Sequence, residues 1–468
     1  MISNSPGKYR VTQKTNKESL TPLERRSIAT LASVYGLRMF GLFLILPVLA
    51  IYAEQLDGAT PMMMGIALGI YGITQAIFQI PFGMLSDRFG RKPLIIFGLL
   101  IFALGSLVAA ASSTIGGVIM GRALQGAGAI AAVVLALTSD LTREDQRTKA
   151  MAIIGMTIGF SFLLALIAAP ILEFFIGVKG LFIMTAVLAC ASIFVVWKLV
   201  PTPVQTFNLE VRAVPTRMLQ LLRNPQLIRL DFGIFILHFV LMAMFVVVPV
   251  ILLEQLELQT HEHWQVYVPA LLASIVFMVP MIILSSRKAW LMRIFFAAIC
   301  ILLVAQALLI WRPMGINGLI ACLFFFFWGF NLLEAMLPSL VSRVAPAASK
   351  GSAMGVYNTF QFTGVFFGGF LGGTLYGAFG VNAVFGICAF LLLIWAYIVR
   401  SAPQIRLLDS LVVTVSAQAG SDCKMQLEAI EGIEEVIIME GERTAYLKVD
   451  KERLDTKAME AIIGFNYL

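Results

Sequence analysis

Four ionisable side chains lie inside stretches of the sequence that are otherwise apolar. Arg38, Arg122, His238 and Glu334 each have hydrophobic residues on both sides. Burying an ionisable group in such a stretch is costly, and in membrane proteins it commonly marks a proton or substrate pathway. The chemistry open to these residue types is reversible protonation and charge pairing. We therefore take all four as candidates for proton coupling.

Glu334 is the preferred proton carrier, because a carboxylate in an apolar interior can bind and release a proton near physiological pH. A permanent ion pair with Arg343 or Arg38 is the alternative for this residue. His238 is a second possible carrier, since an imidazole titrates close to neutral pH. Its alternative is a hydrogen-bonded packing role. Asp231 lies near the start of the same apolar stretch as His238.

Neutral polar side chains recur in three of the apolar stretches. Tyr71, Gln75 and Gln79 are spaced four residues apart, so they share one face of a helix. A polar face on a membrane helix indicates a water-filled cavity or a seam of hydrogen bonds between helices. The candidates for lining a substrate cavity are Tyr71, Gln75, Gln79, Asn331, Tyr357, Asn358 and Gln361.

Twelve apolar stretches must position these side chains, and each is long enough to cross a bilayer as a helix. Only 13% of the 468 residues are charged and 59% are hydrophobic, whereas about 25% are charged in soluble proteins. This composition excludes an ordinary soluble enzyme. The predicted spans are 28–53, 64–86, 93–112, 115–138, 150–173, 180–200, 230–253, 265–286, 291–311, 316–341, 351–378 and 381–400.

The connections between spans predict both orientation and symmetry. Lysine and arginine are concentrated on one side, which the positive-inside rule places in the cytoplasm together with both termini. The longest connection, 201–229, contains four prolines and separates a half at 28–200 from a half at 230–400. Residues 43–49 resemble residues 245–251, so the halves look like a parallel repeat of the kind found in secondary transporters.

The connection after the second span has the most specific motif. Residues 83–92 read GMLSDRFGRK and match the loop signature G-x-L-x-D-R-x-G-R-K of the major facilitator superfamily at every defined position. The opposite charges of Arg91 and Asp140, at the end of the fourth span, predict an ion pair. The resemblance implies that this cluster latches the halves on the cytoplasmic side when the carrier opens outward, with Asp87 then facing the start of the eleventh span. The latch candidates are Gly83, Asp87, Arg88, Gly90, Arg91, Lys92 and Asp140.

Two further motifs extend the resemblance over the whole chain. Residues 122–128, RALQGAG, resemble the R-x-x-Q-G-x-G motif of proton-coupled carriers. The fifth span has Ala169-Pro170 where the antiporter motif has Gly-Pro, which departs from that pattern. Residues 37–39, 73–83 and 331–335 are similar to a group of bacterial inner-membrane carriers, the YajR-like transporters, which have twelve helices and a small cytosolic domain.

The last 65 residues differ from the rest of the chain. The net charge of +7 divides into +12 for residues 1–403 and −5 for residues 404–468. Strand-like and helix-like segments alternate in the order βαββαβ, which predicts a ferredoxin-like domain. It resembles heavy-metal-associated domains, but Cys423 is its only cysteine, so no metal site is expected. We interpret it as a regulatory module that binds the cytosolic loops or an unknown partner.

These observations combine into one prediction. The fold is an all-α polytopic membrane protein of the major facilitator type with a small α+β domain at 404–468, after a disordered cytosolic lead at 1–27. The expected function is proton-coupled efflux of small amphipathic or drug-like molecules by a monomer in a bacterial inner membrane. The alternatives are a facilitator or importer of a metabolite and a membrane sensor that transports nothing. No enzyme activity, cofactor or nucleic-acid partner is expected.

Overall fold

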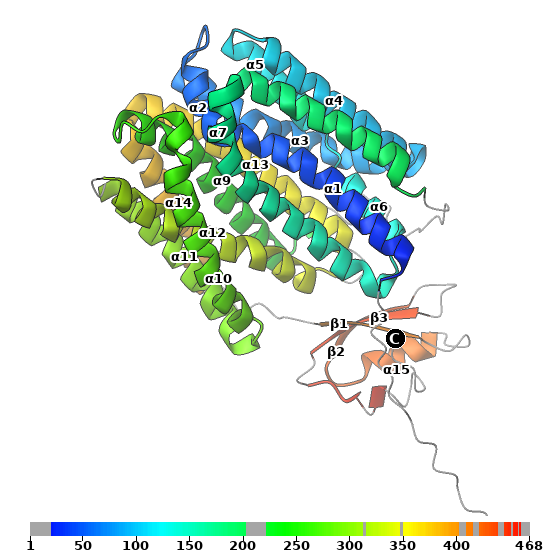
Figure 1. The fold of residues 1–468 in the computed structure, drawn as a ribbon. Helices are drawn as coiled ribbons and strands as arrows, with labels where there is room; N and C mark the ends of the chain where they lie inside the picture. The colour runs from blue at the N-terminus through cyan, green and yellow to red at the C-terminus, as the bar shows by residue number, and fades with distance from the viewer. Residues whose placement is uncertain are drawn as a thin grey trace, which may run out of the picture.

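A bundle of long helices carries a small domain at one end (Figure 1). The computed structural model describes residues 20–202, 221–311, 315–346, 350–401, 409–414, 421–438, 444–450, 453–456 and 458–459. We call the part beyond residue 408 the tail domain. The end of the bundle next to the tail domain is the tail side, and the opposite end is the far side.

Each half of the bundle is built from consecutive helices. The first half contains α1 (Pro22–Leu44), α2 (Leu46–Glu54), α3 (Pro61–Phe89), α4 (Arg91–Ala111), α5 (Ile115–Ala127), α6 (Ala131–Asp140) and α7 (Glu144–Leu199). The second half contains α9 (Pro225–Glu254), the short 3-10 helix η2 (Thr260–Glu262), α10 (Trp264–Ser285), α11 (Lys288–Trp311), α12 (Ile316–Val344), α13 (Lys350–Phe379) and α14 (Val381–Ser401).

The expected twelve spans are confirmed, although one pair is continuous. In the part of the chain that the structure describes, eleven helical segments are long and apolar enough to cross a membrane. One of them, α7, is 56 residues long and reverses at Gly177, where φ is 63° and ψ is 172°. That conformation suits glycine because it has no Cβ. The two arms of α7 therefore account for the predicted fifth and sixth spans.

The first span begins earlier than the sequence pattern indicates. Thr21 caps α1 by accepting a hydrogen bond from the backbone N–H of Glu24, and the Glu24 carboxylate accepts one from the Thr21 N–H. Pro22 occupies the first helical position, where a missing N–H costs nothing. Residues 22–27, expected within a disordered lead, are thus helical because of this capping box.

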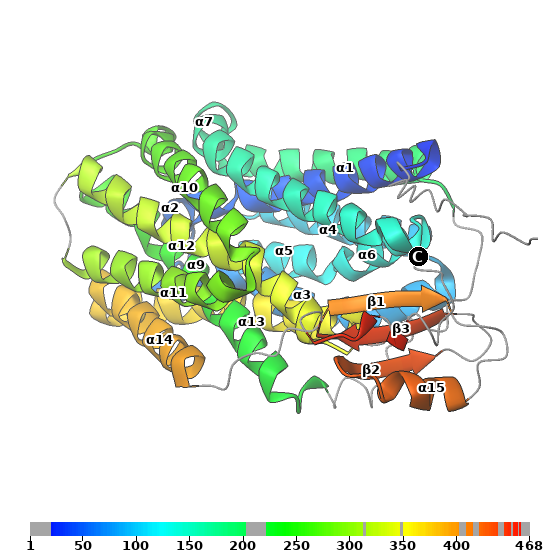
Figure 2. The ribbon, with the colours of Figure 1, turned by 90° about the horizontal axis from the view of Figure 1, so that it is seen from below.

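Several sets of contacts join the halves. The pairs α2–α9, α3–α13, α7–α10, α7–η2 and α3–α9 pack against each other across the boundary. Of these helices, α9 is almost entirely enclosed, because 94% of its most apolar segment is buried inside the protein. Figure 2, seen from below, shows α3 and α13 at the centre of the bundle above the tail domain. Polar side chains on α3, α9 and α13 therefore meet the boundary between the halves.

The tail domain has an antiparallel sheet with a helix on one face. Its elements are β1 (Asp409–Thr414), α15 (Ser421–Glu428), β2 (Ile433–Ile438) and β3 (Thr444–Val449), and the strand order is β1-β3-β2. Leu427, Val436 and Leu447 are buried together in its core. This matches the first four elements of the predicted βαββαβ order. The expected second helix at 454–463 and last strand at 465–468 fall largely outside the described residues.

Candidate functional site

A polar cluster in the second half joins three helices. His238 of α9 places its Nε2 atom 3.9 Å from a carboxylate oxygen of Glu334 on α12. The amide nitrogen of Gln361 on α13 lies 2.8 Å from the same His238 nitrogen. An amide nitrogen only donates, so this contact requires an unprotonated Nε2. The opposite amide orientation would let Gln361 accept from a protonated ring. The cluster can therefore accommodate the imidazole in either protonation state.

The two titratable members of this cluster differ in exposure. The Glu334 side chain is 38% exposed, whereas that of His238 is 9% exposed. The Glu334 oxygen that faces His238 is itself buried and has no hydrogen-bond partner among the described residues. The ion pair in which the structure places Glu334 is with His238, and not with the arginines considered from the sequence. Glu334 is thus not held in a permanent pair with Arg343 or Arg38.

Two further polar groups extend the cluster. Asp231 of α9 is buried, and one of its carboxylate oxygens has no hydrogen-bond partner among the described residues. The hydroxyl of Tyr357 on α13 is likewise buried without a described partner, and it lies within electrostatic range of both Glu334 and Asp231. Asp231 is not among the site residues predicted from the sequence. Its position seven residues before His238, on the same helical face, was the available signal.

Arg38 belongs to a separate cluster in the first half. Its Nη2 donates to the side-chain oxygen of Gln75 at 2.9 Å and to the carbonyl of Gly128 at 3.1 Å. The guanidinium also lies over the ring of Phe102, 5.2 Å from its centroid. Gln75 is 1% exposed, as is Arg38, so this amide binds the arginine instead of facing a cavity. These contacts tie α1 to α3 and to the break between α5 and α6.

Arg122 of α5, also in the first half, is completely buried. Its Nη1 donates to the Gln125 side-chain oxygen at 2.8 Å, and Gln125 donates in turn to the Ser106 hydroxyl at 2.8 Å. The guanidinium lies 4.5 Å from the ring centroid of Tyr71. A cation over an aromatic face is stabilised by the ring quadrupole. The four proton-coupling candidates therefore divide into two groups, and neither arginine is paired with Glu334.

Among the described residues, the side-chain hydrogen bonds that cross between the halves both come from Gln79. The Gln79 amide on α3 donates to the Thr359 hydroxyl on α13 at 2.6 Å. Asn331, another cavity candidate, donates instead to Ser274 within the second half at 3.2 Å. Asn358 is half-buried on α13. Gln79, Tyr357 and Gln361 are thus the cavity candidates that the structure places at the boundary or in the Glu334 cluster.

The loop motif forms an ion-pair network on the tail side. Arg91 donates from Nε to the Asp140 carboxylate at 3.1 Å and also pairs with Asp87. Lys92 donates to the carbonyl of Val200 at 2.7 Å, at the end of α7. Gly90, with φ at 92°, makes the turn between α3 and α4. Arg91 and Asp140 are therefore joined, as their charges predict.

Asp87 does not reach the second half in this structure. It pairs with Arg91 one helical turn away. A Cβ placed on Gly83 would meet nothing within 4 Å, so the Gly83 position itself is not in close helix contact. The contact of Asp87 with the start of the eleventh span, expected for the outward-open carrier, is absent among the described residues. The Asp87 carboxylate is instead paired with the Arg91 guanidinium.

Helices α3 and α13 are in backbone contact toward the far side. A Cβ added to Gly65 would lie 2.1 Å from the carbonyl oxygen of Gly369, and one added to Gly373 would lie 2.2 Å from the Pro61 carbonyl oxygen. Only glycine permits this approach. On the same side, the ring of Phe174 in α7 lies 4.8 Å from the ring of His261 in η2. The halves are therefore in backbone contact on the far side, and toward the tail side α3 and α13 remain joined by the hydrogen bonds of Gln79 to Thr359 and Gly355.

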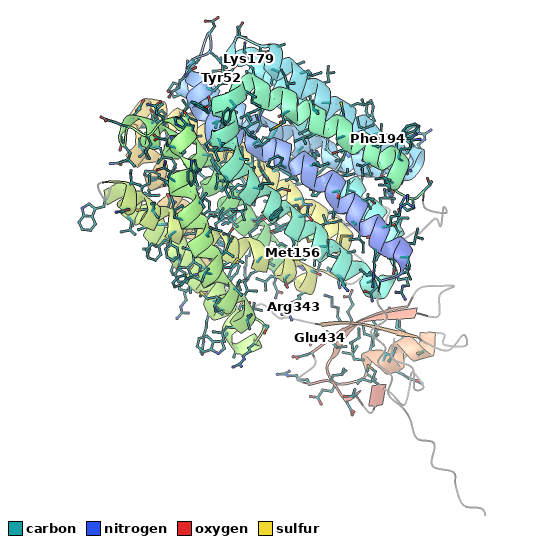
Figure 3. All side chains as sticks on the ribbon, viewed as in Figure 1. Tyr52, Met156, Lys179, Phe194, Arg343 and Glu434 are labelled. Carbon is teal, nitrogen blue, oxygen red and sulfur yellow. The ribbon has the colours of Figure 1, made fainter. Side chains whose placement is uncertain are left out.

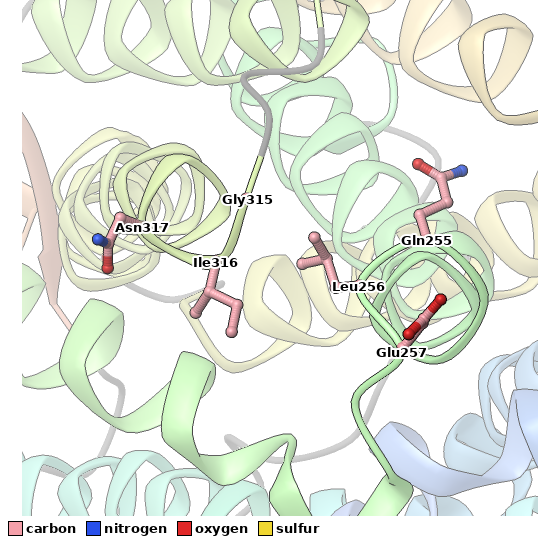
Figure 4. A pocket seen from close by; sticks show the side chains of 6 residues that line it. All are labelled: Gln255, Leu256, Glu257, Gly315, Ile316 and Asn317. Atoms are coloured by element: carbon pink, nitrogen blue, oxygen red, sulfur yellow. The ribbon is translucent and has the colours of Figure 1, made fainter.

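A shallow cavity of about 710 Å³ opens near the far side between the end of α9 and the start of α12 (Figure 4). It is lined by Gln255, Leu256, Glu257, Gly315, Ile316 and Asn317. None of the polar clusters described above contributes to it. Among the described residues, no three histidine, cysteine, aspartate or glutamate side chains gather in a metal-binding arrangement. In the tail domain, burial raises the pKa of Cys423 above its ordinary value, which disfavours the thiolate.

Comparison with protein families gives two matches. The model of the Major Facilitator Superfamily matches residues 31–369. The model of the YajR YAM domain matches residues 413–463, within the tail region.

Individual proteins agree with these matches. The chain is 43% identical to the inner membrane transport protein YajR of Escherichia coli strain K12, over 93% of this chain and 97% of that protein. It is 35% identical to the class B tetracycline resistance protein of Escherichia coli, over 29% of this chain and 34% of that protein. A crystal structure of a bacterial homolog of the human lysosomal transporter Spinster has the same fold, with a TM-score of 0.69 and 12% identity over 82% of this chain and 97% of that one.

Proposed function

Because the chain belongs to the major facilitator superfamily and is a membrane transporter, we propose that it exports small amphipathic or drug-like molecules in exchange for protons. Partial similarity to a tetracycline resistance protein supports a drug-like substrate. The observation that carries the proton coupling is the pair formed by half-exposed Glu334 and buried His238. Such a pair can load a proton from an open cavity and hold it within the protein.

The proposed proton step uses the three helices of this cluster. A proton enters on the Glu334 carboxylate and passes to His238 Nε2, which lies within reach of a small side-chain movement. The protonated His238 Nε2 then donates a hydrogen bond, and Gln361 can accept it when its amide rotates to present the side-chain oxygen. Once the proton has moved, Glu334 is again an anion beside the imidazolium, and the existing contact between His238 on α9 and Gln361 on α13 has exchanged donor and acceptor. Protonation thereby favours one packing of these helices over the other, which is what coupling requires.

The packing of the halves fits alternating access about this cluster. The distribution of basic residues supports a cytoplasmic tail side with both termini in the cytoplasm. In that orientation the backbone contacts between α3 and α13 close the carrier toward the outside. In the opposite state α3 and α13 would approach on the tail side. Asp87 would then exchange part of its pairing with Arg91 for the positive N-terminus of α13.

The decisive experiment compares Glu334→Gln with the parent protein in proteoliposomes. An imposed pH gradient should drive substrate uptake or release by the parent, and the variant should perform only exchange at equal pH. Glu434→Gln, an exposed change in the tail domain, is the matched control. Gradient-driven flux through Glu334→Gln at the parent rate would exclude the coupling role. Binding without flux in the parent would instead favour a sensor.

A further inference from the structure

The tail-domain sheet has one face turned away from its own core. Successive side chains of a strand point to opposite faces. On β3, Ala445, Leu447 and Val449 are buried in the core with Leu427 of α15. Lys448, between the last two of these, must point to the opposite face. In a two-layer domain that face is open to water unless another part of the molecule covers it.

Lys448 is nevertheless only 2% exposed. Its ammonium group donates to the carbonyl oxygen of Arg343 at 2.8 Å and approaches that of Ser342 at 3.5 Å. Both carbonyls belong to the last turn of α12, which ends at Val344. In Figure 3 the labelled Arg343 lies at the end of the bundle that faces the tail domain. The end of α12 therefore covers this face of the sheet at Lys448.

The chemistry of this contact is specific. The last carbonyls of a helix lack partners within the helix and carry the negative end of its dipole. An ammonium group offers three donors and a positive charge, so it complements both features. Taking a lysine out of water is costly unless such partners are present. A lysine buried here without hydrogen-bond partners would destabilise the tail domain, whereas Lys448 is stabilised by its bonds to the carbonyls of α12.

We propose that the open face of the tail-domain sheet is an internal docking surface, and that Lys448 fastens it to the C-terminal end of α12. The chain already connects the tail domain to α14, so docking adds a second attachment on another helix of the same half. The tail domain would then move with the second half as one body. Anything that binds this sheet face would compete with α12, the helix that carries Glu334.

Spin-label distances in the full-length protein test this proposal. In a variant without its five native cysteines, labels would be placed at Arg400→Cys, at the exposed end of α14, and Glu434→Cys, exposed in the tail domain. Nanodisc-embedded parent protein should give one narrow distance distribution. Lys448→Met should broaden it, because losing a charged hydrogen bond shifts the docking equilibrium by about tenfold or more.

Two controls separate docking from general effects. Lys424→Met removes an exposed tail-domain lysine and should leave the distribution narrow, and Lys448→Arg should preserve it because the cation remains. Hydrogen exchange of the β3 amides reports whether the tail domain of Lys448→Met is folded, while exchange of the Ala345 amide, bonded to Val341, should quicken only in that variant.

A broad distribution in the parent protein would overturn the proposal without any substitution. So would an unchanged narrow distribution in a folded Lys448→Met variant. Mixing singly labelled chains tests the remaining arrangement: a short distance between two chains would show that a second copy, and not the chain's own α12, covers the sheet.

Discussion

The Nε2 atom of His238 lies 3.9 Å from a carboxylate oxygen of Glu334, and the two residues come from different helices, α9 and α12. This distance is slightly longer than a hydrogen bond. A small movement of either helix would therefore make or break the contact. The pair is a point where a change of charge and a change of packing can occur together.

Replacing His238 by glutamine should separate exchange from coupling. The substitution keeps a polar side chain beside Gln361 but removes the group that titrates. Counterflow at equal pH should continue, and acceleration by a pH gradient should fall to the level without a gradient. The measurement is substrate flux in proteoliposomes at several imposed gradients. Full gradient dependence in the variant would show that His238 only packs.

The far-side closure depends on glycines that no other residue can replace. A valine at position 369 would bring its Cβ to 2.5 Å from the Gly65 carbonyl oxygen, so Gly369→Val should force α3 and α13 apart. Labels at Asp57 and Glu257, both exposed on far-side loops, should report a longer distance than in the parent. Gly386→Val is the control, because a Cβ there meets nothing within 4 Å. An unchanged distance in Gly369→Val would contradict this account.

Arg122 should prove important for stability. Replacing it by glutamine removes the donor to the buried Gln125 oxygen and the longer contacts with the carbonyls of Ala67 and Leu68, and a buried group left without a partner costs about 1–3 kcal/mol. Thermal unfolding in detergent should therefore shift clearly to lower temperature. Arg223→Gln, at an exposed position, should leave the transition in place. If both variants unfold alike, the buried contacts contribute nothing measurable.

Arg91 and Asp140 should be energetically coupled. A double-mutant cycle with Arg91→Gln and Asp140→Asn should give a coupling free energy of about 0.5–3 kcal/mol in unfolding, as expected for residues in contact. Asp87→Asn should also couple to Arg91→Gln, because the same guanidinium serves both acids. Strict additivity for both pairs would mean that the ion pairs are exchanged freely for water.

Sequence patterns predict the spans and the loop network well, for different reasons. A membrane helix announces itself by a run of about 20 apolar residues, so the twelve spans are local properties. The pairing of Arg91 with Asp140 follows from two charges at neighbouring helix ends. The role of Gln75 does not follow, because its partner Arg38 comes from another helix and draws the amide into the first half.

Other features depend on packing that no local pattern encodes. Asp231 is an acid near a helix start, and only the position of α13 brings Tyr357 within electrostatic range of it. Lys448 looks like an ordinary strand lysine until the end of α12 covers it. Similarly, the loop motif around Asp87 does not indicate which side of the carrier is closed, because the same sequence must fold into both the inward-open and the outward-open state.

The bond from Lys92 to the Val200 carbonyl has a consequence for how the protein is assembled. It joins the start of α4 to the end of α7, where the first six spans end. The first half is therefore held together by a contact between its own residues. Two separately synthesised pieces, divided between residues 203 and 220, would each retain their internal fastenings. The segment that joins the two halves would then serve to produce them in equal number. Their recognition of each other would rest on the surfaces of α3 and α13.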